Sequence, residues 1–253
     1  MIRELFATLC CLACAVSSSG ERLHLLVVGA HPDDPETGAG GLIANWSAAG
    51  HRVTIAYLTT GEAGIPGVPH DEAAQIRRQE ALQAAKILGA EAVFIGQVDG
   101  DTFINNKARQ GFEVLISELA PDLIVTHWLI DAHRDHQVCG TMTYDAWYRN
   151  GSKQPLYFYE VLSGIQTQLF HPTHFLDITA TIETKRSSCY AHASQLTPGD
   201  YADDHAVMEV FRGFQANTRF GEAYVRHPLS PETGVTLQGR VPGPPKDETT
   251  NSQ

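Results

Sequence analysis

The stretch that decides the fold is residues 25–41, Leu-Leu-Val-Val-Gly-Ala-His-Pro-Asp-Asp-Pro-Glu-Thr-Gly-Ala-Gly-Gly. Its first half is a short apolar, β-branched run, which is typical of a strand buried on both faces. Its second half is polar and acidic, and it leads through glycine-rich sequence into a segment that favours a helix. Open α/β sheets bind ligands beyond the carboxyl ends of their strands, so we expect a functional site at this strand end.

A histidine and two adjacent carboxylates follow this strand directly. His31 and Asp34 are three residues apart and can both turn toward one cation, since imidazole and carboxylate are common ligands of divalent metals. Asp33 then points elsewhere and is free to move a proton. By itself, a His-x-x-Asp pair is more often a loop histidine beside a helix cap, so a metal site needs a second group of ligands.

The rest of the chain alternates apolar runs with helical patterns at the spacing of βαβ units. Further strands are predicted at residues 53–58, 92–95, 123–126, 155–161 and 175–178. Helices are predicted at residues 37–50, 72–88, 112–119, 181–194 and 203–216, and another follows a polar loop and runs through residue 147. We therefore expect one Rossmann-like α/β domain over residues 21–238, with a mostly parallel sheet flanked by helices.

Length and charge limit the possible function classes. The chain has 253 residues, a size that a single α/β domain can reach without dividing. Its 29 acidic and 18 basic residues give a formal net charge of −11 at pH 7. This balance argues against nucleic acid or an anionic membrane as the main partner, and it leaves the oligomeric state open, a homo-oligomer included.

Both ends of the chain are expected to lie outside the domain. Residues 1–20 combine Arg3 with a short apolar block and small residues, the pattern of a secretory signal peptide that is too short to span a membrane. We therefore expect an exported protein (periplasmic, extracellular or lipid-anchored), the alternative being a cytoplasmic protein with a mis-assigned start codon. Residues 239–253 are rich in Pro, Gly, Thr and charge, which predicts a disordered tail. Cys139 and Cys189 follow the leader, and the sequence leaves open whether they pair.

A second polar stretch, residues 126–136, follows the strand predicted at residues 123–126. Its His133 and His136 are three residues apart, so at the start of a helix they lie on one side. A solvated polar loop is the simpler explanation of this stretch when it is considered alone. Together with His31 and Asp34 at another strand end of the same sheet, a shared metal site becomes the better explanation.

Several other polar residues lie where they can serve the same site. Glu62 follows the second predicted strand, Arg77 lies on the helix after it, and Asp99 comes just after the third strand. From the residues alone, Arg77 and Glu80 form an ordinary i,i+3 ion pair worth a few tenths of a kcal/mol, and Asp99 is equally well a turn residue. His192, on a later predicted helix, is more often a satisfied structural histidine.

These stretches together resemble the PIG-L/LmbE family of zinc-dependent de-N-acetylases. Residues 30–36, Ala-His-Pro-Asp-Asp-Pro-Glu, match the family signature A-H-P-D-D-x-E. Residues 133–136 resemble its H-x-D-H signature, with Arg134 where proline is usual, and His127 and Asp131 also stand in family-like places. The weaker similarities are to T-x-G-E-x-G at residues 59–64, R-x-x-E at residues 77–80 and D-I-T…K…H-x-S-Q at residues 177–195.

The resemblance implies a zinc site and a general base. Zn²⁺ is expected to be held by His31, Asp34 and His136, a two-His, one-carboxylate set that suits this metal. Zinc bound in this way leaves a position for water and lowers the pKa of that water from 15.7 toward about 7. Asp33 is expected to take the proton of the water and to pass it to the departing amine.

The remaining roles that the resemblance implies concern the oxyanion and the substrate. His133 is expected to share the charge of the tetrahedral oxyanion with the metal, while Asp135 orients and charges the His133 ring. Roles in binding substrate are implied for Arg77, Glu62 and Asp99, and a supporting role behind the site is implied for His192.

The function implied by the resemblance is removal of the N-acetyl group from an N-acetylglucosamine-type sugar or glycoconjugate by metal-activated water. The alternative from another class is a non-catalytic, metal-dependent glycan-binding protein on the same scaffold. Such a protein keeps the ligands and loses the base or the oxyanion donor. Asp33 and His133 are both present, so the enzyme is the preferred hypothesis.

Overall fold

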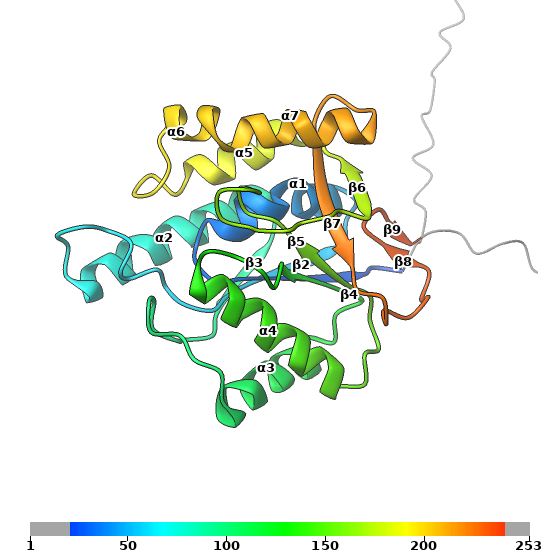
Figure 1. The fold of residues 1–253 in the computed structure, drawn as a ribbon, viewed down its shortest axis with the longest axis horizontal. Coiled ribbons are helices and arrows are strands. Elements are labelled where there is room, and N and C mark those ends of the chain that lie inside the picture. Colours follow the sequence, from blue (N-terminus) through cyan, green and yellow to red (C-terminus); the bar gives the residue numbers. More distant parts are fainter. Residues whose placement is uncertain (1–20, 241–253) are drawn as a thin grey trace, which may run out of the picture.

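The computed structural model of the chain describes residues 21–240, so the predicted signal peptide and all but two residues of the predicted tail lie outside the described part. A seven-stranded sheet forms the centre of the molecule, with helices on both faces (Figure 1). The strands of this sheet are β1 His24–Gly29, β2 Arg52–Tyr57, β3 Glu91–Phe94, β4 Leu123–His127, β5 Leu156–Tyr159, β6 His174–Asp177 and β7 Gly221–Arg226. The helices are α1 Asp34–Ala48, α2 His70–Leu88, α3 Asn106–Leu119, α4 Arg134–Arg149, α5 Ile182–Tyr190, α6 Pro198–Asp203 and α7 His205–Ala216.

The strand order, β3-β2-β1-β4-β5-β7-β6, confirms the expected mostly parallel sheet. β1 pairs in parallel with β2 and β4, and the parallel pairing continues to β3 on one side and β5 on the other. β7 is antiparallel to both β5 and β6. The chain therefore reverses its direction of winding between β1 and β4, and at such a point the loops that follow the two strands diverge and leave a crevice.

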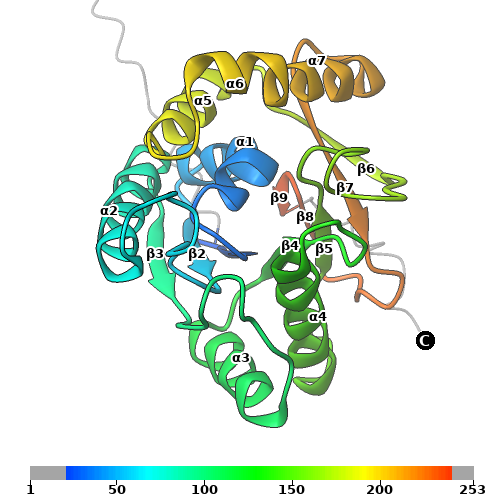
Figure 2. The ribbon, with the colours of Figure 1, turned by 60° about the vertical axis from the view of Figure 1, so that its left-hand side comes forward.

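The apolar run at the N-terminal end of the domain forms a fully buried strand in the middle of the sheet. Every residue of β1 is buried, and its side chains alternate between two cores. Leu25 and Val27 pack with α1, α2 and α5 on one face, while Leu26 and Val28 pack with α3 and α4 on the other. Figure 2 shows these two helical layers on opposite sides of the sheet, with α2 beside the β3 edge.

Glycines let α1 lie unusually close to its neighbours. A Cβ at Gly38 would overlap the ring of Tyr159, and a Cβ at Gly41 would overlap Ile178. The Glu222 carboxylate also accepts hydrogen bonds from the backbone of Gly41 and Leu42, at 2.7 and 2.9 Å. The glycine-rich sequence after the first motif is thus explained by packing and by this buried acceptor, with no phosphate-binding loop involved.

Most predicted elements are confirmed, and the differences have local causes. α3 begins at Asn106 instead of residue 112, because the Asn105 side chain caps it by accepting from the Ala108 amide at 2.8 Å. α5 ends at Tyr190, short of the predicted residue 194, and the short helix α6 was not predicted.

The structure also shows how far the domain extends toward the C-terminus and whether the two cysteines pair. Gly239–Arg240 forms β9, which pairs with β8 at Val235–Thr236, so the predicted start of the tail at residue 239 is wrong for these two residues. Cys139 and Cys189 are both free and buried. Among residues 21–240, no helix combines the length and the apolar character that crossing a bilayer requires.

Candidate metal and active site

A cavity of about 420 Å³ opens at the carboxyl ends of the central strands. It collects side chains from the loop after β1, the start of α1 and α4, the loops after β2, β3 and β5, and the segment between α5 and α7. The polar residues that line it include His31, Asp33, Asp34, Arg77, Asp99, His133, His136, Gln166, Gln195 and His205. The strand-end location expected from the first motif is therefore where the candidate residues meet.

The carboxylate of Asp34 lies between the two predicted histidine ligands. Its Oδ2 is 3.2 Å from His31 Nδ1, and its Oδ1 is 3.2 Å from His136 Nε2. Two ligands that each lie about 2.0–2.1 Å from a tetrahedral zinc ion are roughly 3.3 Å apart, so these separations match the edges of such a site. The two contacts use different oxygens of Asp34. The groups around it whose donor atoms lie within 4.8 Å of one another are His31–His133–His136 and Asp34–His127–His136, which share His136. Imidazole and carboxylate donors gathered in this way suit a divalent cation such as zinc.

Carboxylates also lie beside the outer nitrogen of each ligand histidine. His31 Nε2 is 3.1 Å from Asp99 Oδ1 and 3.3 Å from Asp135 Oδ2, and His136 Nδ1 is 3.2 Å from Asp131 Oδ1. Partners of this kind fix the tautomer and the ring orientation of metal-binding histidines and raise their basicity. Asp131, which the sequence placed only in a family-like position, thus has a definite place in the site.

The electrostatics of the cluster favour a bound cation. Besides the half-buried Asp33, the side chains of Asp34, Asp99, Asp131 and Asp135 are at most 8% exposed. In the described part of the chain, Arg77 is the one arginine or lysine that lines the cavity. Several carboxylates held out of water need compensating positive charge, which a divalent cation can supply.

The pKa values of the histidines reflect this excess of negative charge. Burial by itself lowers the pKa of His31, but hydrogen bonds to Asp135, Asp34 and Asp99 outweigh it and hold that pKa well above its usual value. Burial is likewise outweighed for His136, whose pKa is raised to about 9 chiefly by Asp34 and Asp131. Without a metal, both imidazoles therefore act as cations that neutralise the carboxylates.

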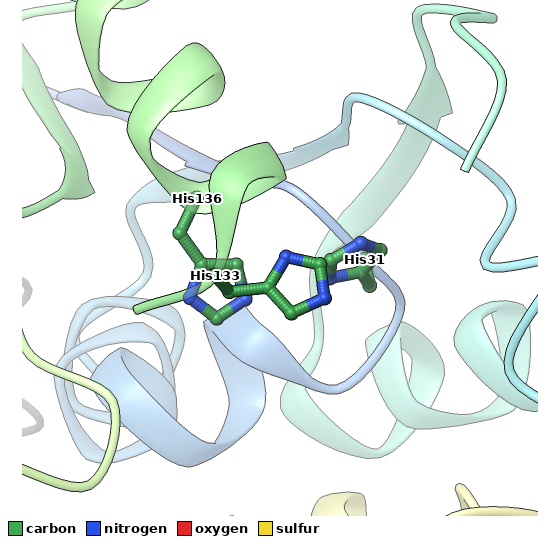
Figure 3. Close-up of side chains that lie close together, drawn as sticks. All are labelled: His31, His133 and His136. Carbon is green, nitrogen blue, oxygen red and sulfur yellow. The ribbon is translucent and has the colours of Figure 1, made fainter. Parts of the chain in front are cut away.

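His133 and His127 lie next to these ligands but differ in their hydrogen bonds. Figure 3 shows His31, His133 and His136 grouped together, and nitrogens of these three histidines lie within 4.8 Å of one another. His127 stacks on His136 with ring centres 4.2 Å apart, but its Nε2 accepts the backbone N–H of Ala30 at 3.0 Å. That lone pair is occupied, and burial lowers the pKa of His127 to about 4, so it is a neutral support for the site.

Asp33 lines the cavity in a strained backbone conformation and has two hydrogen-bond partners. Its φ of 111° lies in a region that residues with a side chain rarely adopt. Arg77 Nη2 donates to Asp33 Oδ2 at 3.1 Å, and the Asp33 amide donates to Glu36 Oε2 at 3.2 Å. Burial, supported by the neighbouring Asp34 and opposed by Arg77, raises the pKa of Asp33 to about 6. A carboxylate that titrates this close to neutrality suits a general base.

The structure corrects the expected partnership between Asp135 and His133. The Asp135 carboxylate accepts from Thr102 Oγ1 at 2.6 Å and from the Gly100 amide at 2.8 Å, and it lies beside His31. His133 meets only the backbone of Asp135, whose N–H donates to His133 Nδ1 at 3.3 Å. Burial, followed by the nearby His31 and His136, lowers the pKa of His133. The His133 ring is therefore neutral, with its proton on Nε2, and the prediction that Asp135 charges it is wrong.

Two of the predicted substrate contacts have other partners in the structure. Arg77 is only 3% exposed and donates to the backbone oxygens of Pro32 and Gly61 as well as to Asp33. The predicted i,i+3 ion pair between Arg77 and Glu80 is therefore wrong. Glu62 is not among the residues that line the cavity, and its carboxylate accepts the Asp99 amide at 3.1 Å. Glu62 thus supports the loop that carries Asp99.

Behind Asp33 lies Glu36, a buried carboxylate for which the sequence analysis gave no role. Glu36 is fully buried, and its Oε1 accepts the Tyr57 hydroxyl at 2.5 Å. His192 Nε2, also fully buried, lies 3.5 Å from Glu36 Oε2, which raises the pKa of His192 against the effect of burial. The signal for Glu36 was the last letter of the A-H-P-D-D-x-E string, but only the tertiary contacts reveal what it touches.

Comparison with known proteins agrees with this geometry. The model of the PIG-L family, described as GlcNAc-PI de-N-acetylase, matches residues 26–147. The chain is 28% identical over 186 residues to diacetylchitobiose deacetylase of Thermococcus kodakarensis, covering 68% of this chain and 69% of that protein. It is 27% identical over 221 residues to 4-oxalmesaconate hydratase of Pseudomonas putida, covering 80% and 84%.

A solved structure shares the fold. N,N'-diacetylchitobiose deacetylase from Pyrococcus horikoshii superposes with a TM-score of 0.70 at 22% identity, covering 85% of this chain and 90% of that one. The matched residues run from β1 into α4 and so include both signature stretches, the one with His31 and the one with His133 and His136. Residues 26–147 therefore match the PIG-L family, and the chain shares its fold with a solved deacetylase.

Proposed function

We propose that the protein is a zinc-dependent N-deacetylase that acts on an N-acetylglucosamine-type sugar or glycoconjugate. One observation carries the proposal: the Asp34 carboxylate lies between His31 and His136, and a carboxylate of raised pKa, Asp33, faces the same cavity. Relatives that are de-N-acetylases of such sugars support the choice of reaction.

His31, Asp34 and His136 are the residues that would hold the metal. When bound there, zinc supplies a Lewis acid that polarises an amide carbonyl and lowers the pKa of water toward about 7. Asp131 and Asp99 orient the two imidazoles by lying against their outer nitrogens. All three proposed ligands line the same cavity, which supports this assignment.

Asp33 and His133, which line the same cavity, complete the chemistry. Asp33 takes the proton from the attacking water, while Arg77 holds the second carboxylate oxygen, and Asp33 then protonates the amine that leaves. His133 donates its Nε2–H to the developing oxyanion as a neutral imidazole, since its Nδ1 already accepts the Asp135 amide. Loss of such a donor typically costs about 2.7–4 kcal/mol in the transition state.

The relative that is a hydratase motivates a second candidate, water addition to an unsaturated polycarboxylate. The lining of the cavity argues against it. Arg77 is the one permanently cationic side chain that the described residues place there, and its guanidinium already binds Asp33 and two backbone oxygens. Asp33, Asp34 and Asp99 would repel additional carboxylates, so a neutral amide is the better substrate.

The deciding experiment measures acetate and free amine released from diacetylchitobiose and a panel of N-acetylglucosamine conjugates. The zinc-loaded protein should release one acetate for each amine, and Asp33→Asn should retain the metal while losing about 10²–10⁴-fold in rate. Binding of the glycans without release of acetate would favour the non-catalytic alternative. Loss of 4-oxalmesaconate absorbance, with no acetate from any sugar, would favour the hydratase.

A further inference from the structure

Helix α7 has an inverted distribution of polar and apolar side chains. Its inner face carries Glu209 and Arg212, which are 3% and 6% exposed. Apart from Gln215, the exposed residues of the helix are apolar, with exposed fractions of 58% for Val207, 53% for Val210, 48% for Phe211 and 83% for Phe214. A helix on the surface of a monomer normally shows the opposite arrangement. We call these four outward residues the α7 apolar face.

The charged inner face is fixed by specific ion pairs, so the helix cannot simply rotate. Glu209 accepts two hydrogen bonds from Arg186, at 2.9 and 3.1 Å, and also contacts the Tyr201 hydroxyl. Arg212 makes a bidentate pair with Glu160 at 2.5 and 2.6 Å. Turning the apolar face inward would leave buried charges without partners, which is strongly unfavourable. Its exposure is therefore a stable property of the fold.

We propose that the α7 apolar face binds the same face of a second copy of this chain, with the two helices antiparallel about a two-fold axis. The spacing of the four residues is the same when it is read in reverse, as a two-fold interface requires. In that arrangement Val207 of one copy meets Phe214 of the other, and Val210 meets Phe211. Each large ring then faces a small side chain, which allows the two surfaces to interdigitate.

Charges at the two ends of α7 support the antiparallel direction. Asp203 and Asp204 are exposed just before the helix begins, and Arg219 is exposed just after it ends. Antiparallel pairing brings the acidic end of each copy toward the basic end of the other, whereas parallel pairing would place like charges together. The opposed helix dipoles favour the same arrangement.

The surface beside the helix enlarges the contact. The Arg212 guanidinium lies 5.0 Å from the centre of the Phe211 ring and 5.8 Å from that of Phe170, and it joins α7 to the loop after β5. Leu169 on that loop is 70% exposed. In both Figure 1 and Figure 2, α7 runs along an outer edge of the molecule, where a second copy can approach it. This extension matters because a stable dimer usually buries about 800 Å² per partner.

The experiment is sedimentation velocity of the full chain over a range of concentrations. The wild type should have the mass of two chains, and Phe214→Glu should have the mass of one while keeping wild-type kcat, since Phe214 does not line the cavity. Phe214→Ala should raise the dimer dissociation constant by about 30-fold or more, as expected for a large aromatic anchor. Val114→Glu, a matched change at a 52% exposed valine on α3, should remain a dimer.

A charge reversal tests the direction of the two helices. Arg219→Asp should weaken the dimer, and combining it with Asp203→Arg and Asp204→Arg should restore the wild-type dissociation constant. A monomeric wild type, a dimer that survives Phe214→Glu, or failure of the triple variant to recover would each overturn the proposal. So would Phe214-dependent binding of a monomeric wild type to phosphatidylcholine vesicles, because lipid would then be the occupant.

Discussion

Replacing Glu36 with Gln tests whether the buried group behind Asp33 positions the base. Glu36 accepts the Tyr57 hydroxyl on one oxygen and the Asp33 amide on the other. Gln has a single acceptor oxygen, so one of these buried donors loses its acceptor. An unsatisfied buried donor costs about 1–3 kcal/mol. At roughly 2–4 °C per kcal/mol for a chain of this size, the melting temperature should fall by about 2–12 °C.

Glu36→Gln should also lower kcat, because Glu36 helps to hold Asp33 in place. Asp33 has a φ of 111°, a conformation that costs of order 1–3 kcal/mol relative to the relaxed backbone. Two hydrogen bonds hold it there, one from its amide to Glu36 and one from Arg77 to its carboxylate. Losing one hydrogen bond to a charged group, about 1.5–3 kcal/mol, should lower kcat roughly 10- to 150-fold if the whole effect reaches the transition state. KM and zinc content should change little, because the Glu36 carboxylate contacts neither the cavity nor the ligands.

The assay compares acetate release by the wild type, Glu36→Gln, Asp33→Asn and the double variant. If Glu36 acts through Asp33, the double variant should be no slower than Asp33→Asn alone. An equal further loss of kcat in the Asp33→Asn background would refute the positioning role. Glu80→Gln is the matched control. Its carboxylate caps Ser194 at 2.7–2.8 Å away from Asp33, so it should affect stability and leave kcat unchanged.

Four further predictions concern the metal, the oxyanion donor, the base and the core. Because the pKa values of His31 and His136 are both raised, zinc must displace a proton from each, and zinc affinity measured by competitive titration should fall about 100-fold for each unit by which the pH is lowered beneath both pKa values. His133→Ala should keep the metal and lower kcat about 10²–10³-fold with little change in KM, whereas loss of zinc would make His133 a ligand. Protonation of Asp33 below about pH 6 should lower the wild-type kcat, and that acidic limb should be absent in Asp33→Asn. Lys185→Met should destabilise the protein by about 3–5 kcal/mol in urea unfolding, because it strands the buried Glu222 carboxylate 2.8 Å away, and a loss below 1 kcal/mol would contradict this.

The central strand and the position of the site could be predicted from the sequence because their signals are local. A continuous apolar run at residues 25–28, bounded by glycine, predicts a buried strand, and polar residues directly after it are expected at the edge of the sheet. His31 and Asp34 are three residues apart, as are His133 and His136. A single turn of backbone is enough to bring the two members of each pair together. Two such pairs at the ends of β1 and β4 meet because these strands are neighbours in the sheet.

The partners of those residues were decided only by the tertiary structure. Asp135 is two positions from His133, but its carboxylate binds Thr102 and Gly100, which arrive from the loop after β3. Glu36 meets Tyr57 only because β2 lies beside β1. The outward apolar face of α7 follows in the same way from ion pairs to residues 186 and 160, far away in the chain. Sequence spacing specifies which side chains one turn of helix or strand presents together, whereas long-range packing selects what each of them touches.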